Sequence, residues 1–140
     1  MITIEELLGK YEFKDLDKES QDNLLILLHK INKVRKLYNN KMLATSGVRT
    51  REDQIRIYKQ KMGSSFDINK VPFKSKHLVG AAVDIFDPDQ KLQKWCLDHQ
   101  KELAEIGLWM EDFKYTKNWC HFQCLPYGSW KEGKSIFFIP

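Results

Sequence analysis

The segment SKHLVGAAVDIFD (residues 75–87) carries the strongest structural signal in the chain. Its second half, AAVDIFD (81–87), is apolar and partly β-branched, which predicts a buried strand. Asp84 lies in the middle of that strand, where a carboxylate is costly unless it is paired or bound to a cation. His77 precedes it by seven residues, and the small residues at 80–82 leave room for close approach. The segment predicts either a metal-binding pair or a surface histidine with an aspartate on the exposed face of an edge strand.

A second histidine, His121, lies in the segment NWCHFQC (118–124), which also has the pattern of a strand. Side chains alternate between the two faces of a strand, so His121 and Gln123 share one face. The other face carries Cys120, Phe122 and Cys124. The cysteines are therefore predicted to pack in the core as small hydrophobic residues, rather than to join the histidine around a metal.

His77, Asp84 and His121 remain as one candidate set of metal ligands. Two imidazoles and one carboxylate suit zinc, and three protein ligands with a fourth position open to water are typical of a catalytic zinc site. These residue types therefore favour a zinc enzyme over a structural zinc site, which is usually closed by four protein ligands.

Periodicities along the rest of the chain predict an α+β fold. Thr3 and Glu6 form a capping-box pattern before a short helix, and residues 18–38 have the spacing of one long amphipathic helix. The expected elements after it are a strand within 41–48, a helix at 51–62, a loop at 63–76, a helix from Asp87 to Gly107, and strands at 81–87, 108–112, 119–124 and 135–139. We therefore expect one domain, residues 1–140, with a small, mostly antiparallel sheet that carries a zinc site, flanked by N-terminal helices and one inserted helix.

The composition is ordinary for a soluble chain of 140 residues, with 42% hydrophobic residues, 30% charged residues and a net charge of +4. No apolar run is long enough to span a membrane, and no secretory leader is visible, so synthesis in the cytoplasm is expected. Three cysteines are an odd number, which argues against a disulfide framework. The charges are scattered without a basic stripe, so neither a nucleic-acid partner nor membrane insertion is expected.

Three motifs resemble those of one family. SKHLVGAAVD (75–84) matches the S-x-H-x-x-G-x-A-x-D signature of the zinc D-Ala-D-Ala carboxypeptidase and L-alanyl-D-glutamate peptidase family, whose core resembles the hedgehog signalling domain. Upstream, SGVRT (46–50) is similar to the family's S-G-x-R-[ST] segment. Downstream, WMEDFKYTKNWCHF (109–122) resembles the W-G-G-D-W-K-x-x-x-D-x-P-H-F stretch of phage endolysins. The motifs occur in family order within residues 41–125, and residues 1–40 match no motif.

The resemblance implies a role for each matched residue. His77, Asp84 and His121 would be the ligands of one zinc ion. Arg49 would bind a substrate carboxylate or the polarised carbonyl, a task that suits its planar guanidinium. Ser75 would bind substrate by hydrogen bonding near the site.

One position departs from the family pattern. The catalytic acid of the family lies three residues before the second histidine, where this chain has Asn118, and an amide cannot accept and return a proton. In one interpretation Glu111 or Asp112 replaces that acid, and strand alternation lets only one of the two face the metal. In a second interpretation zinc and Arg49 alone give slow hydrolysis. In a third, the domain binds a peptide without cleaving it.

The function implied by the resemblance is that of a zinc-dependent peptidase of phage or prophage type, which hydrolyses peptidoglycan stem peptides. Carboxypeptidase and L-Ala-D-Glu endopeptidase activities both fit the family. The alternative is a catalytically impaired, zinc-containing module that binds peptidoglycan or another peptide. The protein would be made in the cytoplasm and would act in the bacterial cell wall after release.

Overall fold

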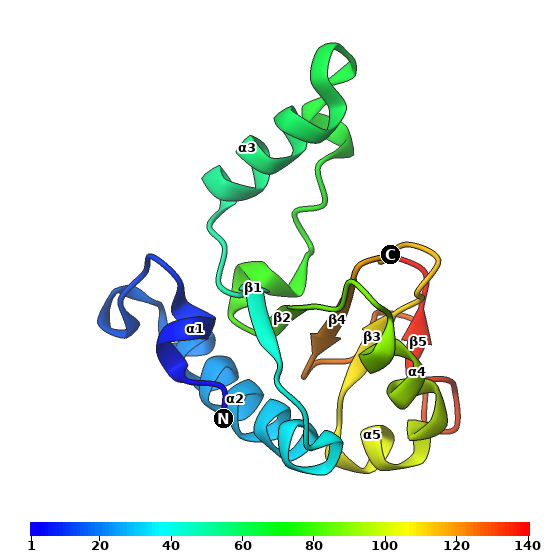
Figure 1. Ribbon diagram of the computed structural model, residues 1–140. Helices are drawn as coiled ribbons and strands as arrows, with labels where there is room; N and C mark the ends of the chain where they lie inside the picture. Colours follow the sequence, from blue (N-terminus) through cyan, green and yellow to red (C-terminus); the bar gives the residue numbers. More distant parts are fainter.

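Five strands form the sheet of the computed structural model, which describes residues 1–140 (Figure 1). They are β1 (Leu43–Ser46), β2 (Ala82–Phe86), β3 (Trp109–Glu111), β4 (Trp119–Gln123) and β5 (Phe137–Phe138), in the spatial order β1-β2-β4-β3-β5. All neighbouring pairs are antiparallel except β3 and β5, which run parallel. With five α-helices around it, this sheet confirms the predicted α+β class.

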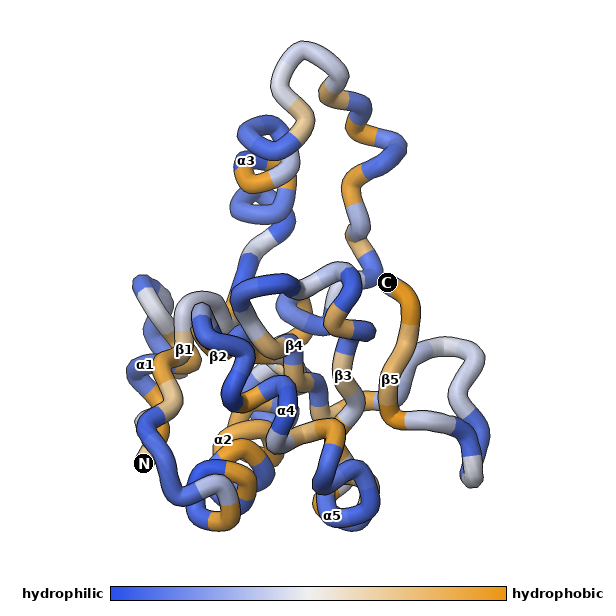
Figure 2. Tube along the Cα trace, turned by 45° about the vertical axis from the view of Figure 1, so that its right-hand side comes forward, coloured by the Kyte–Doolittle hydropathy of each residue, from blue (hydrophilic) through white to orange (hydrophobic).

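The hydrophobic core lies between the sheet and the helices, which include α1 (Ile4–Leu8) and α2 (Lys18–Tyr38). The long helix α2 has the predicted bounds, because Asp17 caps its first turn and Asn39 ends it in the left-handed conformation. Its apolar stripe faces the strands, and Figure 2 shows hydrophobic residues gathered along α2 and in the sheet. No helix combines the length and the apolarity needed to cross a membrane.

The strands turn alternate side chains into this core. Val83 of β2 and both Cys120 and Phe122 of β4 are fully buried in it, so the predicted core position of the cysteines is confirmed. Burial raises the pKa of the Cys124 thiol to about 11, which keeps this thiol protonated and unreactive at neutral pH. The opposite face of the same two strands carries the polar side chains Asp84, His121 and Gln123, and the site described below is built there.

The helix predicted from Asp87 to Gly107 is divided into two, α4 (Lys91–Asp98) and α5 (Gln100–Ile106). The chain first makes a turn after Asp87. The Asp87 carboxylate then caps α4 although it lies four residues before the helix, because it accepts hydrogen bonds from the backbone N–H groups of Leu92 and Gln93. The division falls at His99, whose ring stacks on Trp95 with ring centroids 4.2 Å apart and whose Nδ1 lies 2.7 Å from the Trp95 carbonyl oxygen. These side-chain contacts compete with a continuous helix, which periodicity alone does not reveal.

An arm projects from the sheet between β1 and β2 (Figures 1 and 2). We define the arm as residues 50–76; it contains α3 (Arg51–Met62) and the short 3₁₀ turns Gly63–Ser65 and Ile68–Lys70. Its two ends meet where the backbone N–H of Arg49 donates to the carbonyl oxygen of His77 over 3.1 Å. No residue of the arm belongs to the hydrophobic core, so the arm is an addition to the fold rather than part of its interior.

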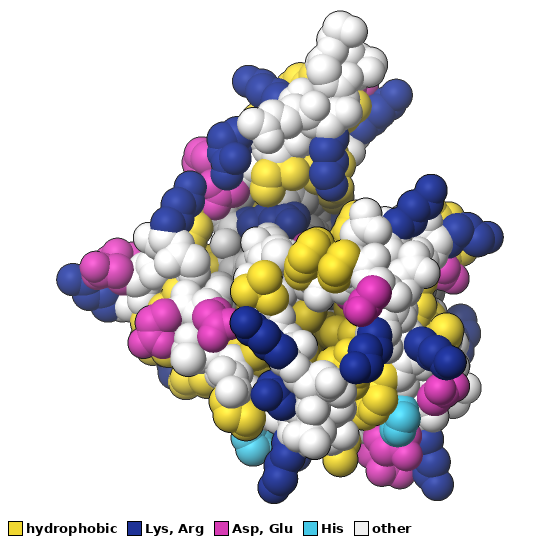
Figure 3. All heavy atoms as spheres, in the orientation of Figure 1, with side chains coloured by type: hydrophobic (Ala, Val, Ile, Leu, Met, Phe, Trp, Pro, Cys, Tyr) yellow, Lys and Arg dark blue, Asp and Glu magenta, His cyan; other side chains and the backbone are white.

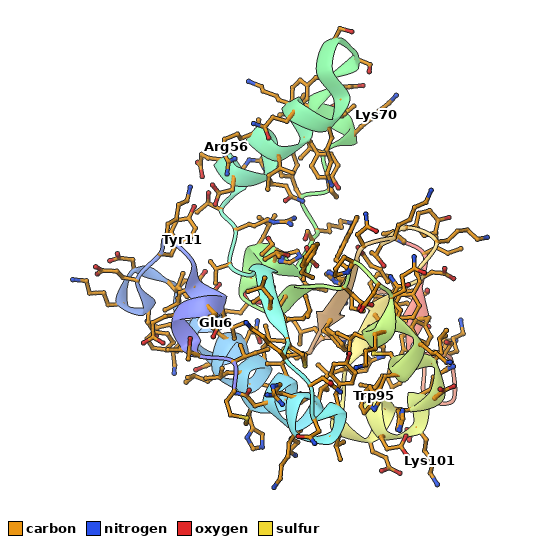
Figure 4. The ribbon with its side chains drawn as sticks, viewed as in Figure 1. Glu6, Tyr11, Arg56, Lys70, Trp95 and Lys101 are labelled. Atoms are coloured by element: carbon orange, nitrogen blue, oxygen red, sulfur yellow. The ribbon has the colours of Figure 1, made fainter.

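Buried polar side chains fasten the base of the arm. Gln54 donates from Nε2 to the Pro72 carbonyl oxygen over 2.9 Å and so joins the outgoing and returning segments. Asp53 accepts hydrogen bonds from Tyr11 and pairs with Arg56, both of which are labelled in Figure 4. Burial would raise the pKa of Asp53, but these hydrogen bonds lower it well below its usual range. The arm is therefore anchored to the N-terminal segment through an ionised carboxylate.

The N-terminal helices also support the segments that flank the site. The backbone N–H of Val48 donates to the Leu7 carbonyl oxygen over 2.9 Å. Gly80 has a φ of +70°, and a Cβ at this position would lie 2.6 Å from the Ser20 carbonyl oxygen. Only glycine suits both the conformation and the close approach of α2, so residues 1–40 act as scaffold for the turn that carries His77.

Candidate metal centre

Three side chains converge on the polar face of the sheet, and they are the three predicted ligands. His77 lies in the 3₁₀ turn Lys76–Val79, while Asp84 and His121 are paired with each other across β2 and β4. One ligand atom from each residue lies within 4.8 Å of the others, and all three residues are buried. Asp84 Oδ1 is 3.3 Å from His77 Nε2 and 3.0 Å from His121 Nδ1.

The tautomer of His77 is set by a backbone carbonyl. Its Nδ1 lies 2.8 Å from the Gly47 carbonyl oxygen. Because a carbonyl oxygen can only accept, Nδ1 carries the proton in this hydrogen bond, and Nε2 keeps its lone pair in the neutral ring. Nε2 is buried and forms no hydrogen bond of good geometry, although Asp84 Oδ1 lies 3.3 Å away, so a strong ligand atom points into the cluster.

The tautomer of His121 is set by Gln123. His121 Nε2 lies 2.8 Å from Gln123 Oε1, while Gln123 Nε2 donates to the Leu125 carbonyl oxygen over 2.7 Å. The second contact orients the amide, because its nitrogen is the end that can donate to a carbonyl. Oε1 must therefore accept a hydrogen bond from His121 Nε2–H, and the other ring nitrogen, Nδ1, faces Asp84 Oδ1 over 3.0 Å.

This arrangement fits a divalent cation. His77 Nε2 and His121 Nδ1 both face the Asp84 carboxylate. Burial would lower the pKa of His121, but its hydrogen bond to Asp84 raises it, so the cluster favours a positive charge beside the carboxylate, which either a proton or a metal ion can supply. Burial would raise the pKa of Asp84, but His77 and His121 lower it far below its usual range, so the carboxylate is charged. Two nitrogen donors and one oxygen donor are a typical set for zinc.

Arg49 is part of the same cluster. Its Nη2 lies 3.3 Å from Asp84 Oδ2, so the second carboxylate oxygen is held while Oδ1 faces the histidines. Nε donates to Ser46 Oγ over 3.0 Å, and Nη1 donates to Gln54 Oε1 over 3.3 Å. Ser75, the other predicted substrate-binding residue, accepts from the backbone N–H of His77 and so shapes the turn; substrate binding by Ser75 stays a prediction.

The two candidate acids are separated by the strand pairing. Continuing the β3–β4 register by one residue places Glu111 opposite His121, and Glu111 Oε2 lies 4.0 Å from His121 Nδ1. Asp112 instead belongs to a local turn, where its Oδ1 accepts from the backbone N–H of Lys114 over 2.9 Å. Asn118 is exposed just before β4, and its carbonyl oxygen accepts from the N–H of Asp87. The structure therefore brings Glu111 to the cluster and leaves Asp112 and Asn118 outside it.

A row of side chains crosses the whole sheet at the level of the cluster. Strand register aligns one residue from each strand, in the order Ser46, Asp84, His121, Glu111 and Phe138. The Phe138 ring meets the His121 ring at a centroid distance of 6.2 Å and stacks on Tyr127. In Figure 3 the surface is hollowed where the arm joins the body. We call this set of five residues the site row.

Gly47, Gln123 and Phe138 are site residues that the sequence reasoning did not identify. Gln123 had a usable signal, since it shares the strand face of His121 two positions away. Gly47 lies in the SGVRT motif, but the contact of its carbonyl with His77 depends on packing between distant segments. Phe138 reaches the row only through the parallel pairing of β5 with β3.

The fold and the cluster together define an α+β protein with a possible metal site built on adjacent antiparallel strands. The chain belongs to the VanY family of D-alanyl-D-alanine carboxypeptidases, whose model matches residues 14–135. Membership supports a peptidoglycan-acting peptidase of the carboxypeptidase kind, in a family that is generally zinc-dependent. The match confirms the resemblance carried by the motifs and extends it into α2. Searches of curated proteins and of solved structures each gave no match.

Gln123→Leu is expected to weaken zinc binding by about 10–100-fold, the usual effect of removing a group that orients a ligand. Without the Gln123 acceptor, His121 is no longer held with Nδ1 facing Asp84. A competition titration with a coloured chelator measures the affinity, and ¹⁵N chemical shifts of the imidazole report the tautomer in the metal-free protein. Gln123→Glu keeps an acceptor and should lose far less affinity. Equal affinity in the wild type and Gln123→Leu would contradict this role.

Proposed function

We propose that this protein is a zinc-dependent peptidase that removes D-alanine from peptidoglycan stem peptides, with His77, Asp84 and His121 as the ligands of one zinc ion. The observation that carries the proposal is the convergence of His77 Nε2, His121 Nδ1 and a buried carboxylate within 4.8 Å of one another. Family membership supplies the substrate class. When bound there, zinc would polarise the scissile carbonyl and make a water molecule more acidic.

Glu111 is proposed as the general acid and base in place of the family's missing acid. Its Oε2 lies beside the cluster and is partly exposed, so it can accept a proton from the attacking water and return it to the leaving amine nitrogen. This transfer is the task that Asn118 cannot perform. The position of Glu111 supports an active enzyme over the alternative of a zinc-containing module that binds peptide without cleaving it.

Arg49 is proposed to bind the substrate through the donors that Asp84, Ser46 and Gln54 do not occupy. A guanidinium has five N–H donors, and three of them are engaged in the contacts described above. The remaining donors suit the terminal carboxylate of the peptide or the oxygen of the scissile carbonyl, where negative charge develops during attack. Its hydrogen bonds hold the guanidinium in place before substrate arrives.

The biological setting is also proposed. Residues 109–122 resemble a stretch of phage endolysins, which supports a phage or prophage enzyme that is made in the cytoplasm and acts on the cell wall after release. The same resemblance keeps endopeptidase cleavage between L-alanine and D-glutamate as the second candidate activity.

The test is an assay of the purified protein on a soluble stem peptide that ends in D-alanyl-D-alanine, and on intact peptidoglycan. The proposal expects release of free D-alanine, loss of the activity with a chelator, and recovery with added zinc. New amine groups without free D-alanine would indicate the endopeptidase. A protein that binds zinc and peptidoglycan but releases neither product would be a binding module, which overturns the proposal.

A further inference from the structure

The net charge of the chain is concentrated in the arm, in contrast to the scattered charge expected from the sequence. The arm, residues 50–76, contains seven lysines and arginines and three aspartates and glutamates, which gives it a net charge of +4. The other 113 residues contain the remaining 16 basic and 16 acidic side chains, so they are neutral in sum. All of the excess positive charge is therefore on a projecting segment that contributes nothing to the core.

Most of these basic side chains form no ion pair within the protein and are available to bind an anion. Asp53 neutralises Arg56 and also binds Lys10 from outside the arm. The other six basic side chains form no ion pair, and they are Arg51, Lys59, Lys61, Lys70, Lys74 and Lys76. In Figure 3 dark blue side chains surround the arm, and in Figure 4 Arg56 and Lys70 point away from its opposite sides.

Aromatic rings support three of the free cations. The Arg51 guanidinium lies 3.8 Å from the centroid of the Phe73 ring. Lys59 lies over Phe66 and Lys61 over Tyr58, with the ammonium groups 5.6 and 4.9 Å from the ring centroids. Cation–π contacts restrict these long side chains while leaving their charge exposed to solvent. Less side-chain entropy is then lost when an anion binds.

We infer that the arm is a docking surface for the negatively charged carboxylates of uncut peptidoglycan. The choice of partner rests on the proposed function and on the position of the arm. Arg49 and His77, at the two ends of the arm, both belong to the metal centre. A polymer held on the arm is thus held beside the cluster. A substrate for a carboxypeptidase ends in a free carboxylate, and a mesh of such peptides is a polyanion that complements the arm.

The test compares two triple variants that remove the same charge from different places. The arm variant carries Lys59→Gln, Lys61→Gln and Lys70→Gln, which lower the net charge of the arm from +4 to +1. The control variant carries Lys33→Gln, Lys36→Gln and Lys41→Gln, which remove three exposed lysines at the far end of the molecule. Binding is measured by co-sedimentation with purified peptidoglycan that has been chemically stripped of phosphodiester polymers. The arm variant should bind at least about 10-fold more weakly at low salt, and the difference should shrink at about 1 M salt. The control should bind as the wild type does, within about threefold.

Three results would overturn the inference. Equal losses in both variants would mean that only the total charge matters, and no loss in either would mean that the arm does not bind the mesh. Binding of the wild type only to walls that retain phosphodiester polymers, or preferential binding to a DNA duplex, would identify a different anion.

A soluble D-alanyl-D-alanine peptide separates this inference from the proposed function. The arm variant should cleave this short peptide with an unchanged kcat, because residues of the metal centre are intact. If the wild type cleaves nothing but still binds the stripped peptidoglycan through the arm, the proposed function fails and the docking surface stands.

Discussion

Glu111→Gln is expected to lower kcat/KM by about 10²–10⁴-fold, the range that a general acid and base contributes to catalysis. Glutamine has nearly the same shape, but its amide cannot carry a proton between water and the leaving amine. Because Glu111 lies beside His121 without being one of the three convergent ligands, the variant should still bind one zinc ion. The measurement is D-alanine release from a soluble peptide, together with zinc content by elemental analysis.

Asp112→Asn is the matched control, since Asp112 is the neighbouring acid and its carboxylate is engaged in a local turn. It should retain most of the activity. The opposite pattern, with a large loss in Asp112→Asn and little in Glu111→Gln, would contradict the assignment of the acid. A third outcome is an inert wild type together with an Asn118→Asp variant that gains chelator-sensitive activity. In that case no other acid replaces the one that the family has at position 118, and the binding-module interpretation is correct.

His77→Ala is expected to abolish stoichiometric zinc binding and to lower the activity by at least about 10³-fold, because a metal that activates water and carbonyl contributes several kcal/mol to catalysis. The variant removes the buried Nε2 that points into the cluster, and two remaining ligands make a much weaker site. Zinc content after dialysis against a weak chelator measures the first effect, and D-alanine release measures the second.

His29→Ala is the control for this experiment, because His29 is an exposed residue of α2 far from the cluster in sequence. It should keep both zinc and activity. Circular dichroism of both variants checks that the fold is retained, because His77→Ala also removes the hydrogen bond from the buried imidazole to the Gly47 carbonyl oxygen. Full zinc content in folded His77→Ala would show that the metal lies elsewhere.

The sequence predicted the parts of this structure that depend on local rules. The periodicity of residues 18–38 defined α2 to the residue. Strand alternation placed Cys120 and Phe122 in the core and His121 on the other face. The three candidate ligands come together because the register of β2 and β4 pairs Asp84 with His121 directly.

The remaining features depend on contacts between distant segments. Alternation stated that either Glu111 or Asp112 faces the cluster, but only the pairing of β3 with β4 selects Glu111. The break at His99 results from its stacking on Trp95. The charges looked scattered along the sequence, and their concentration on the arm emerges only once residues 50–76 are seen to leave the body of the protein.

If the substrate lies along the site row, the width of the sheet limits how many of its residues can contact the strands. Neighbouring strands are about 4.8 Å apart, so a peptide lying along the row crosses the strands and has about 10 Å on each side of His121, the length of about three extended residues. An exopeptidase that removes one terminal residue uses little of one side, whereas an endopeptidase fills both. At the end of the row that contains Phe138, the Phe138 ring stacks on the Tyr127 ring and bounds the row on that side. The shortest peptide that is cleaved at full rate therefore indicates how much of the sheet the substrate covers.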